Sequence, residues 1–525
     1  MGRPLTEPPS PAAGRAAPSS APYDVAVIGG GITGAGIARD AALRGLKVVL
    51  FEKDDFASGT TGRNLKMIHG GPRYLEYAPH VTKESCEESA IIQRIAPDVV
   101  FRVPFMRVVM PGDTRTMREL DAFFSEYDRY HVLKNGVKHC ILTGEEARRL
   151  EPRLSRQVTG AVTFDEFAAH PQRLTWLNLM DARAHGAVLY NHAPVTGFRV
   201  ERGAIVAVKV RIEGREREFA VKSVVNATGP WGDRVAKLAG LDVPLRPTRG
   251  TIVFFDRVLS RLGLFCQAID GREVAMVPHF GETMLGWTDE DHFGSPDDVK
   301  PTEDEVNYLL ASAARAMPGL EHERMVRAIA GVRPLVYAWG VPESAVTRDL
   351  EVVTHERQGV ANLVSATGGK MVTYRAVAEQ SVDAVCRILG KRARCTTATR
   401  PLPRDPWIAE RLEPKGQTTC TCENLGPAAV QRAAAHEMAT TLEDVARRTQ
   451  WGWGPCHGAR CALPGGSLLA HAAQAAPGSA IPDVMRFLER RFDEERFALG
   501  RGQEAAAELV QHLVAFGLRP RREAP

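Results

Sequence analysis

Four cysteines near the C-terminal end of this 525-residue chain have a spacing that suits a metal centre. Cys420 and Cys422 form a C-x-C pair, and Cys456 and Cys461 form a C-x4-C pair further along. Four thiolates can hold a [2Fe–2S] cluster or a structural zinc ion. Because zinc sites more often use C-x2-C pairs, the spacing favours iron–sulfur, with zinc and unligated thiols as the alternatives.

A glycine motif near the N-terminus predicts a second kind of chemistry. Gly29, Gly31 and Gly34 stand at G-x-G-x-x-G spacing. They would permit a tight turn, close approach of the backbone to a pyrophosphate, and close packing of a helix on a sheet. Glu52 ends the next apolar run, where its carboxylate can accept hydrogen bonds from a ribose diol and would repel the 2′-phosphate of NADP. The motif predicts a dinucleotide site but does not by itself separate FAD from NAD.

Another glycine turn occurs in the stretch SATGGKMVTYR, where Gly368, Gly369 and Lys370 precede a predicted helix. A helix N-terminus carries free N–H groups and the positive end of the helix dipole. The turn could therefore face the pyrimidine edge of a flavin ring and stabilise the negative charge of its reduced form. The alternative is an ordinary strand-to-helix turn.

Basic residues recur beside glycine or proline. They are Lys66 and Arg73 around the sequence HGG, Arg333 in AGVRP, Arg348 in TRD, and Lys370. Arginine suits bidentate recognition of a carboxylate or a phosphate. Any one of these residues could be a solvated surface group, but their repeated placement beside turns indicates an anionic substrate.

Hydrophobic periodicity predicts the elements that must position these residues. A strand at 24–28, a helix at 32–43 and a strand at 47–51 would frame the first glycine motif, and a strand at 363–367 with a helix from about 373 to 389 would frame the second turn. Further strands are expected at 101–110, 161–164, 188–190, 195–200, 204–211, 221–228, 249–255, 274–277 and 283–287. Further helices are expected at 77–96, 115–130, 171–185 and 302–317. The last of these helices would be capped by Thr302, with Glu305 at the capping-box position.

Composition excludes several other classes of protein. The chain is 44% hydrophobic and 25% charged, with a net charge of +4, and it has no basic run interleaved with aromatic residues, so no nucleic-acid partner is expected. No apolar stretch approaches the ~20 residues of a membrane span. Residues 1–22 are rich in Pro, Ala and Ser and lack the apolar core of a signal peptide, which predicts a disordered tail. Nine cysteines without such a signal indicate a reducing compartment.

The C-terminal part begins after a stretch at 400–417 that is rich in proline and charge and is interpreted as a linker. The last forty residues have helical periodicity. Phe487, Leu488, Phe492 and Phe497 form an apolar stripe at helical spacing, which we interpret as core packing; a surface for a partner or a membrane is the alternative.

Several motifs in one order resemble a known family. The chain is similar, from about Tyr23 to its C-terminus, to the flavin subunit of the anaerobic-type, FAD-dependent glycerol-3-phosphate dehydrogenases, within the D-amino-acid-oxidase-like flavoproteins. The resemblance rests on VIGGGITGAGIARDAALRGL, KMIHGGPRYLE, VNATGPW, AGVRPL, TGGKMVTYR and CTTA. The sequence CTCE…GWGPCHGARC resembles the BFD-like [2Fe–2S] module that ends this type of subunit.

The resemblance implies an α/β fold class, in which a Rossmann-like FAD-binding domain is interleaved with a substrate domain that contains a β-sheet. A small helical, cysteine-rich domain follows. The implied oxidoreductase covers residues 23–395, with FAD-binding parts at about 23–100, 161–240 and 345–395 and substrate-domain parts at about 101–160 and 241–344. A linker would cover 396–417, and the BFD-like module with its C-terminal helices would cover 418–525.

The resemblance also implies which residues hold FAD. These residues come from the glycine turns and the segments beside them: Gly29, Gly30, Gly31, Thr33, Gly34, Glu52, Lys53, Thr60, Thr61, His69, Gly70, Gly71, Thr228, Gly229, Gly368, Gly369, Lys370 and Thr373. The implied reaction is oxidation of sn-glycerol 3-phosphate to dihydroxyacetone phosphate, with hydride transfer to FAD. Arg73, Arg333 and Lys370 would bind the phosphate or polarise the hydroxyl. His69 and His279 are candidates for the base, with a structural role as the alternative for each.

The implied partners are electron-transfer subunits and a quinone, reached from FAD through a [2Fe–2S] cluster held by the four C-terminal cysteines. The implied location is the cytoplasm, with peripheral association at the cytoplasmic face of the inner membrane through those subunits. Three residues depart from the family pattern: Pro72 replaces an aliphatic residue, His170 replaces an acid, and Trp287 replaces a threonine in a turn near the substrate.

Two other functions compete with this interpretation. One is an opine, amine or 2-hydroxy-acid dehydrogenase of the same superfamily, in which a substrate carboxylate takes the place of the phosphate. The other is a non-catalytic flavin and iron–sulfur redox sensor, which would bind both cofactors without reduction by a substrate. An NAD-dependent dehydrogenase is disfavoured, because the chain carries one full G-x-G-x-x-G motif.

Overall fold

The structure is a computed structural model. It describes residues 21–337, 340, 350–414 and 416–495. Arg348, Phe497 and the predicted tail up to residue 20 lie outside the described residues. The described chain divides into two compact units. The larger unit contains residues 21–323 and 329–404, and the C-terminal unit contains residues 324–328 and 405–495.

A six-stranded sheet forms the first layer of the larger unit, with the strand order β17–β18–β10–β1–β2–β6. Its strands are β1 (Val25–Ile28), β2 (Val48–Phe51), β6 (Val188–Tyr190), β10 (Val224–Asn226), β17 (Leu350–Thr354) and β18 (Leu363–Gly368). All neighbours are parallel except β17, which pairs antiparallel with β18 at the edge. Strands β1 and β2 are apolar throughout, because a parallel sheet is covered on both faces.

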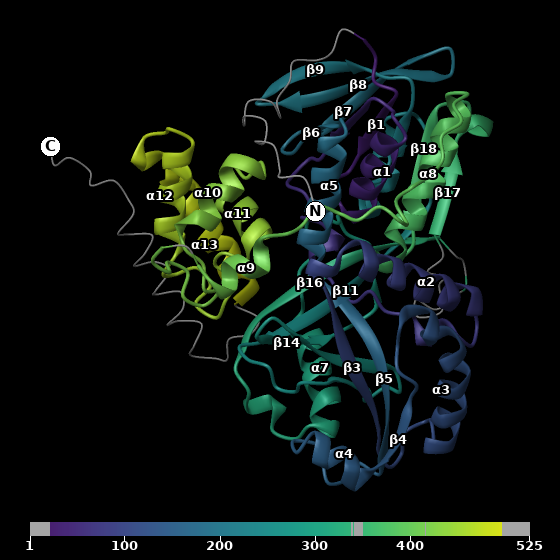
Figure 1. Cartoon of the computed structure of the whole chain (residues 1–525), viewed down its shortest axis with the longest axis vertical. Coiled ribbons are helices and arrows are strands. Elements are labelled where there is room, and N and C mark those ends of the chain that lie inside the picture. The colour runs from purple at the N-terminus through teal and green to yellow at the C-terminus, as the bar shows by residue number, and fades with distance from the viewer. Residues whose placement is uncertain (1–20, 338–339, 341–349, 415, 496–525) are drawn as a thin grey trace, which may run out of the picture. The chain divides into compact units, whose positions relative to one another are not determined.

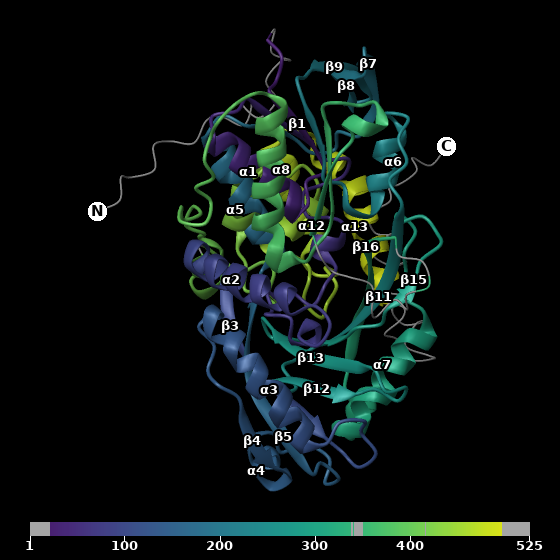
Figure 2. The same cartoon turned by 90° about the vertical axis from the view of Figure 1, so that its right-hand side faces the viewer.

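Three helices pack side by side in this layer (Figure 2). They are α1 (Ile32–Leu43), α5 (Pro171–Ala184) and α8 (Tyr374–Ile388). Helix α1 contacts both of the other helices. The order of strand, glycine turn, helix and strand places both glycine turns at the carboxyl ends of parallel strands, where ligands bind in open α/β sheets.

A nine-stranded mixed sheet forms the second layer of the larger unit. Eight of its strands follow the order β15–β11–β14–β13–β12–β3–β5–β4, and the ninth, β16, pairs with β11. Its strands are β3 (Val100–Val109), β4 (Cys140–Thr143), β5 (Gly160–Ala169), β11 (Leu245–Phe255), β12 (Gly263–Gln267), β13 (Glu273–His279), β14 (Glu282–Gly286), β15 (Glu290–Asp291) and β16 (Met325–Val336). Helix α7 (Glu303–Ala316) packs on β11, β12 and β13 (Figure 2). The remaining helices of this unit are α2 (Pro79–Ile95), α3 (Met117–His131), α4 (Gly144–Leu150) and α6 (Gly232–Lys237).

A small antiparallel sheet of β7 (Val195–Glu201), β8 (Ala204–Ile212) and β9 (Arg215–Ala220) completes the larger unit. The helix predicted at 32–43 has those bounds in the structure, and the predicted capping box of Thr302 and Glu305 is present. The strand predicted at 221–228 is shorter, at Val224–Asn226. The turn predicted at AGVRP is wrong, because these residues lie inside β16.

The C-terminal unit is helical (Figure 1). It contains α9 (Trp407–Leu412), α10 (Pro427–His436), α11 (Leu442–Thr449), α12 (Ala462–Ala472) and α13 (Ile481–Glu495). Helix α9 lies within the stretch interpreted as a linker. Phe487 and Leu488 are buried, which confirms core packing for that part of the apolar stripe. None of the helices in the described residues has the length and apolar character needed to cross a membrane.

Candidate active site and cysteine centre

The first glycine motif closes a turn that tolerates no side chains at two positions. Gly29 has φ +105°, and a Cβ there would lie 2.5 Å from the Ala227 carbonyl oxygen. A Cβ on Gly34 would lie 1.9 Å from the Gly29 carbonyl oxygen. The first turn of α1 therefore packs directly on the end of β1, as a pyrophosphate cradle requires.

Glu52 lies at the end of β2 and is tied to the same turn. The Gly30 N–H donates to Glu52 Oε2 at 2.6 Å, and the Asp54 N–H donates to Oε1 at 2.9 Å. Burial raises the pKa of Glu52 to about 7, against the effect of these two hydrogen bonds. The carboxylate oxygens have lone pairs left to accept hydroxyl groups, so the site fits the ribose diol of a dinucleotide.

Two threonines after β2 connect this turn to other segments. Thr61 Oγ1 accepts from the Ile32 N–H at 3.1 Å, at the start of α1. Thr60 Oγ1 donates to the Val332 carbonyl oxygen at 2.5 Å. Both lie beside the predicted cofactor turn, whereas Lys53 instead bonds Asp297 Oδ1 at 2.5 Å.

The second glycine turn joins β18 to α8 through a short 3-10 helix at Met371–Thr373. Gly368 and Gly369 have φ +68° and +73°, which favours glycine at both positions. The Lys370 N–H donates to Thr373 Oγ1 at 3.1 Å. The turn therefore presents a helix start beside a lysine, as the sequence predicted for an anion site.

Arg73 and Lys370 meet at one aromatic ring although 297 positions separate them in the sequence. The Arg73 guanidinium carbon lies 5.5 Å from the Tyr74 ring centroid, and Lys370 Nζ lies 4.8 Å from it. Arg73 also lies 5.9 Å from the centroid of Trp287. Cation–π contacts thus hold both cations at the Tyr74 ring, where two positive charges together can attract an anion.

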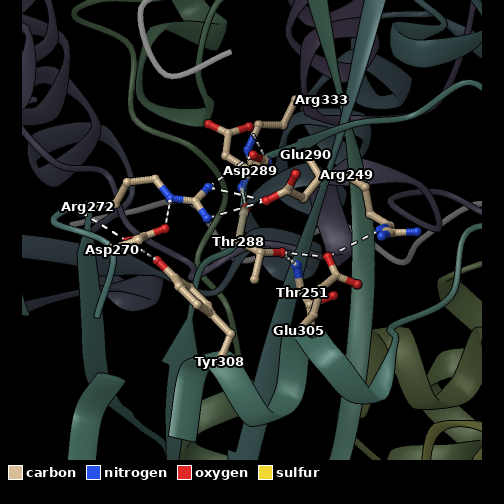
Figure 3. Close-up of polar contacts among 10 residues, drawn as sticks. All are labelled: Arg249, Thr251, Asp270, Arg272, Thr288, Asp289, Glu290, Glu305, Tyr308 and Arg333. Atoms are coloured by element: carbon tan, nitrogen blue, oxygen red, sulfur yellow. Dashed lines mark hydrogen bonds and ion pairs between the residues drawn. The ribbon is translucent and has the colours of Figure 1, made fainter. Parts of the chain in front are cut away.

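Arg333 reaches the same region from β16 (Figure 3). Its Nη1 donates to Asp289 Oδ1 at 3.1 Å, and its Nη2 donates to the Thr288 carbonyl oxygen at 3.1 Å. Asp289 also acts electrostatically on Arg73. A Cβ on Gly250 would lie 2.2 Å from Arg333 Nη2, so the guanidinium lies directly over a strand glycine that no sequence motif marks.

His69 belongs to this group, and His279 does not. Burial is the main cause that lowers the pKa of His69 to about 4; Glu166 opposes the shift, and the charges of Lys370, Lys134 and Arg73 add to it. The imidazole is therefore neutral at pH 7 and able to accept a proton. The His279 ring instead packs among aromatic rings, 4.5 Å from Phe280 between centroids.

A buried polar group behind His69 was not predicted from the sequence. Glu166 Oε2 accepts from the Gly70 N–H at 2.9 Å and pairs with Lys134 Nζ at 2.6 Å. Tyr127 donates to Glu166 Oε1 at 2.7 Å and accepts from Lys134 at 2.9 Å. This group fixes the HGG turn next to His69. Its residues lie on α3, η5 (Val132–Lys134) and β5, so no local spacing in the sequence links them.

The predicted residues Lys66, Thr228, Gly229 and Thr33 lie in separate segments of the chain. Lys66 is buried and donates to the Gly62 carbonyl oxygen at 3.2 Å, so its ammonium is used within its own loop. Thr228 follows β10 and donates to Asn226 Oδ1 at 2.6 Å, and Gly229 has φ +57°. Thr33 lies in the first turn of α1.

The structure shows the positions and contacts of the three residues that depart from the family pattern. Pro72 is the first residue of a 3-10 helix, where proline is favoured, and Gly71 before it has φ +71°. His170 is the N-cap of α5, where its Nδ1 accepts from the Arg173 N–H at 3.2 Å, so it does the capping that an acid would do. Trp287 contacts Arg73 as described.

The four C-terminal cysteines converge in the C-terminal unit. The Cys461 thiol lies close enough to Cys420, and the Cys456 thiol close enough to Cys422, to act on the pKa of that neighbour. Cys420 and its neighbours hold the pKa of Cys461 well above the usual range, and the Cys461 hydrogen bond lowers the pKa of Cys420. Within the described residues the four thiols form two close pairs, and no three of the sulfurs lie within 4.8 Å of one another. Two pairs of thiolates fit a centre with two iron atoms.

The glycines around Cys456 make close approach to these sulfurs possible. A Cβ on Gly454 would lie 2.3 Å from Cys422 Cβ, and glycines at 452 and 458 lie against the Phe487 ring. The Gly452 N–H donates to the Cys420 thiol, and the Cys456 N–H donates to the Cys422 thiol. Contacts of N–H groups with sulfur stabilise thiolates, so the donor set fits an iron–sulfur cluster.

Comparison with known proteins agrees with this site. Residues 24–375 match the family described as FAD dependent oxidoreductase. One relative is a chain of the anaerobic glycerol-3-phosphate dehydrogenase of Escherichia coli (strain K12), which is 32% identical over 89% of this chain and 92% of its own. The corresponding chain of the Haloferax volcanii enzyme is 33% identical, over 83% of this chain and 81% of its own. Both relatives carry names that mark them as subunits.

Among solved structures, the glycerol-3-phosphate dehydrogenase of Bacillus halodurans complexed with FAD shares the fold, with a TM-score of 0.66 and 24% identity over 97% of each chain. The predicted α/β fold class and the predicted use of FAD, rather than NAD, are confirmed. The chain belongs to the FAD dependent oxidoreductase family and is an enzyme of that family.

Proposed function

We propose that this enzyme oxidises sn-glycerol 3-phosphate to dihydroxyacetone phosphate. The observation that carries the proposal is the gathering of Arg73, Lys370 and Arg333 from three separate segments around Tyr74 and Asp289. Several cations in one place suit a phosphate dianion, and arginine suits its planar, bidentate recognition. The names of relatives that are more than 30% identical over most of the chain support the same substrate.

The residues proposed to hold FAD lie on the two glycine turns and the segments that pack on them. Glu52 would accept hydrogen bonds from the ribose, and the start of α1 would bind the pyrophosphate. Lys370 and the start of the 3-10 helix before α8 would face the flavin ring. When bound, FAD supplies the acceptor for the hydride that leaves C2 of the substrate.

The chain's own residues would handle the proton and the charge. In this proposal one or two of the three cations bind the phosphate, and another lies near the C2 hydroxyl and lowers its pKa. A ring nitrogen of His69 accepts the hydroxyl proton, because this imidazole is neutral at pH 7. The buried ion pair of Glu166 and Lys134 holds the backbone next to His69 in place.

We also propose that Cys420, Cys422, Cys456 and Cys461 hold a [2Fe–2S] cluster, which would take electrons from the flavin and pass them towards a quinone through partner subunits. The convergence of the thiols supports a metal centre, and the C-x-C spacing favours iron–sulfur over zinc. The names of the relatives support partner chains, and any membrane association would run through those partners.

One measurement tests the proposal. The protein is purified without oxygen, and its visible spectrum is recorded before and after addition of sn-glycerol 3-phosphate. We expect flavin bands with a broad iron–sulfur shoulder, bleached by the substrate. Flavin bands unaffected by glycerol 3-phosphate but bleached by a 2-hydroxy acid or an opine would replace the substrate assignment. Stoichiometric zinc without the shoulder would replace the cluster assignment.

A further inference from the structure

Three helices of the larger unit begin with the same capping box of threonine and glutamate. The pairs are Thr116 and Glu119 in α3, Thr143 and Glu146 in α4, and Thr302 and Glu305 in α7. In the first two helices the glutamate is exposed. Glu305 is only 6% exposed. A cap works at the surface, so the burial of this carboxylate points to an additional role.

The two oxygens of Glu305 make different contacts. Oε2 accepts from the Thr302 N–H at 3.1 Å and from Thr302 Oγ1 at 3.0 Å, which completes the cap. Oε1 accepts from Thr288 Oγ1 at 2.7 Å and from Arg249 Nε at 3.2 Å (Figure 3). One oxygen therefore starts α7, and the other reaches into the turn after β14.

Thr288 connects Glu305 to Arg333 through its hydrogen bonds. Its hydroxyl donates to Glu305 and accepts from the Thr251 N–H at 2.9 Å, while its carbonyl oxygen accepts from Arg333 Nη2. Thr288 is 2% exposed and Thr251 is fully buried, so water does not compete for these bonds. The side chain of Thr288 is thus fixed by Glu305, and its main chain fixes one nitrogen of the guanidinium.

We propose that Glu305 is a positioning residue for Arg333, acting through the Thr288 hydroxyl. The inference rests on the proposed function in one respect: Arg333 must bind the anionic substrate. If Thr288 lost its hydroxyl bond, its peptide could rotate, and Arg333 Nη2 would lose an acceptor that sets the direction of the guanidinium. Anion affinity would then fall, although Arg333 itself would still be present.

The test compares variants of the FAD-loaded enzyme. Thr288→Val removes the hydroxyl at nearly constant shape, Thr288→Ser keeps it, and Glu305→Gln leaves a single acceptor oxygen for both tasks. Glu119→Gln is the matched control, because it weakens the same type of cap on α3 away from Arg333. The measurements are the dissociation constant of inorganic phosphate by calorimetry, KM and kcat for sn-glycerol 3-phosphate, and Tm.

We expect Thr288→Val and Glu305→Gln to weaken phosphate binding and raise KM by about tenfold, with Thr288→Ser within about twofold of the wild type. Glu119→Gln should lower Tm slightly and leave phosphate binding unchanged. The inference is overturned if the wild type binds no phosphate, or if Glu305→Gln only lowers Tm as Glu119→Gln does. If phosphate binding weakens as expected while glycerol 3-phosphate leaves the flavin unreduced, the positioning role stands and the proposed substrate fails.

Discussion

The cationic group of the larger unit draws Arg73, Arg333 and Lys370 from three distant segments, whereas the cysteines of the C-terminal unit all lie within residues 420–461. Each cation is held by its own neighbours: an aromatic ring for two of them, and a carboxylate with a carbonyl oxygen for Arg333. The thiols, in contrast, interact within their own set: Cys461 acts on the pKa of Cys420, and Cys456 acts on the pKa of Cys422.

This difference predicts different responses to mutation. A centre whose ligands act together should be lost when one ligand is removed, because the remaining thiols cannot complete the coordination. A group of separately held cations should instead lose function by degrees, according to which contact is removed. The following predictions test that contrast, from the largest expected effect to the smallest.

Replacing one cysteine should abolish the proposed cluster. For Cys456→Ser we expect iron to fall from about two atoms per chain to a background level, with the flavin still reduced by substrate. Iron content and the visible shoulder are the measurements. Cys140→Ser, at an exposed cysteine on β4, is the control and should keep its iron. Full iron content in Cys456→Ser would show that the four thiols do not act as one ligand set.

Removing Arg333 should lower kcat/KM for sn-glycerol 3-phosphate by about 10²- to 10³-fold, because a charged donor to the substrate is lost. The flavin content should stay near the wild-type value, since most residues proposed to hold FAD lie in the other layer of the unit. Steady-state kinetics of Arg333→Ala would be compared with those of Arg118→Ala, an exposed arginine on α3. A loss of less than about threefold would remove Arg333 from the substrate site.

A methyl group at position 250 should displace the Arg333 guanidinium without unfolding the protein. The new Cβ would lie 2.2 Å from Arg333 Nη2, at the far end of a flexible side chain. That side chain can move aside while the backbone of the strand keeps its position. For Gly250→Ala we expect about a tenfold to hundredfold loss of kcat/KM and a small change in Tm. Gly197→Ala on β7, where the nearest atom would be 3.7 Å away, is the matched control. Normal kinetics in Gly250→Ala would mean that Arg333 has other productive positions.

FAD affinity should depend on pH through Glu52. Burial raises the pKa of this carboxyl to about 7 in the free protein, so it is protonated below that pH. A ribose diol needs the carboxylate as acceptor, and binding must then release the proton. The dissociation constant of FAD should therefore rise by up to about tenfold for each pH unit below 7 and level off above about pH 8.

Fluorescence titration of FAD between pH 5.5 and 8.5 measures this dependence. Glu52→Gln should bind FAD more weakly at high pH but lose the slope below pH 7, since its side chain does not titrate. A slope that persists in Glu52→Gln would assign the pH dependence to a group other than Glu52.

The glycine turn, the acid after β2 and the cysteine pairs could be predicted from the sequence because each depends on residues that are close together in it. The same holds for the capping box of α7, whose Thr302 and Glu305 are three residues apart. Helix α1 could be placed correctly because its start is set by the glycine motif and its end by the glycine at 45, which has positive φ. The turn predicted at AGVRP is wrong, because pairing between β16 and β11 overrides the local preference of glycine and proline.

Local sequence therefore determined the two kinds of centre that this chain carries: a dinucleotide turn and a set of four thiols. Only the tertiary structure decided which basic residues gather, that His69 is neutral among them, and that Glu305 and Glu166 act behind them. The physical reason is that these contacts join strands and helices far apart in the sequence, and they form only after the sheets have paired. No local sequence pattern marks a buried carboxylate such as Glu166 or Glu305, because its role depends on the hydrogen-bond partners that folding brings next to it.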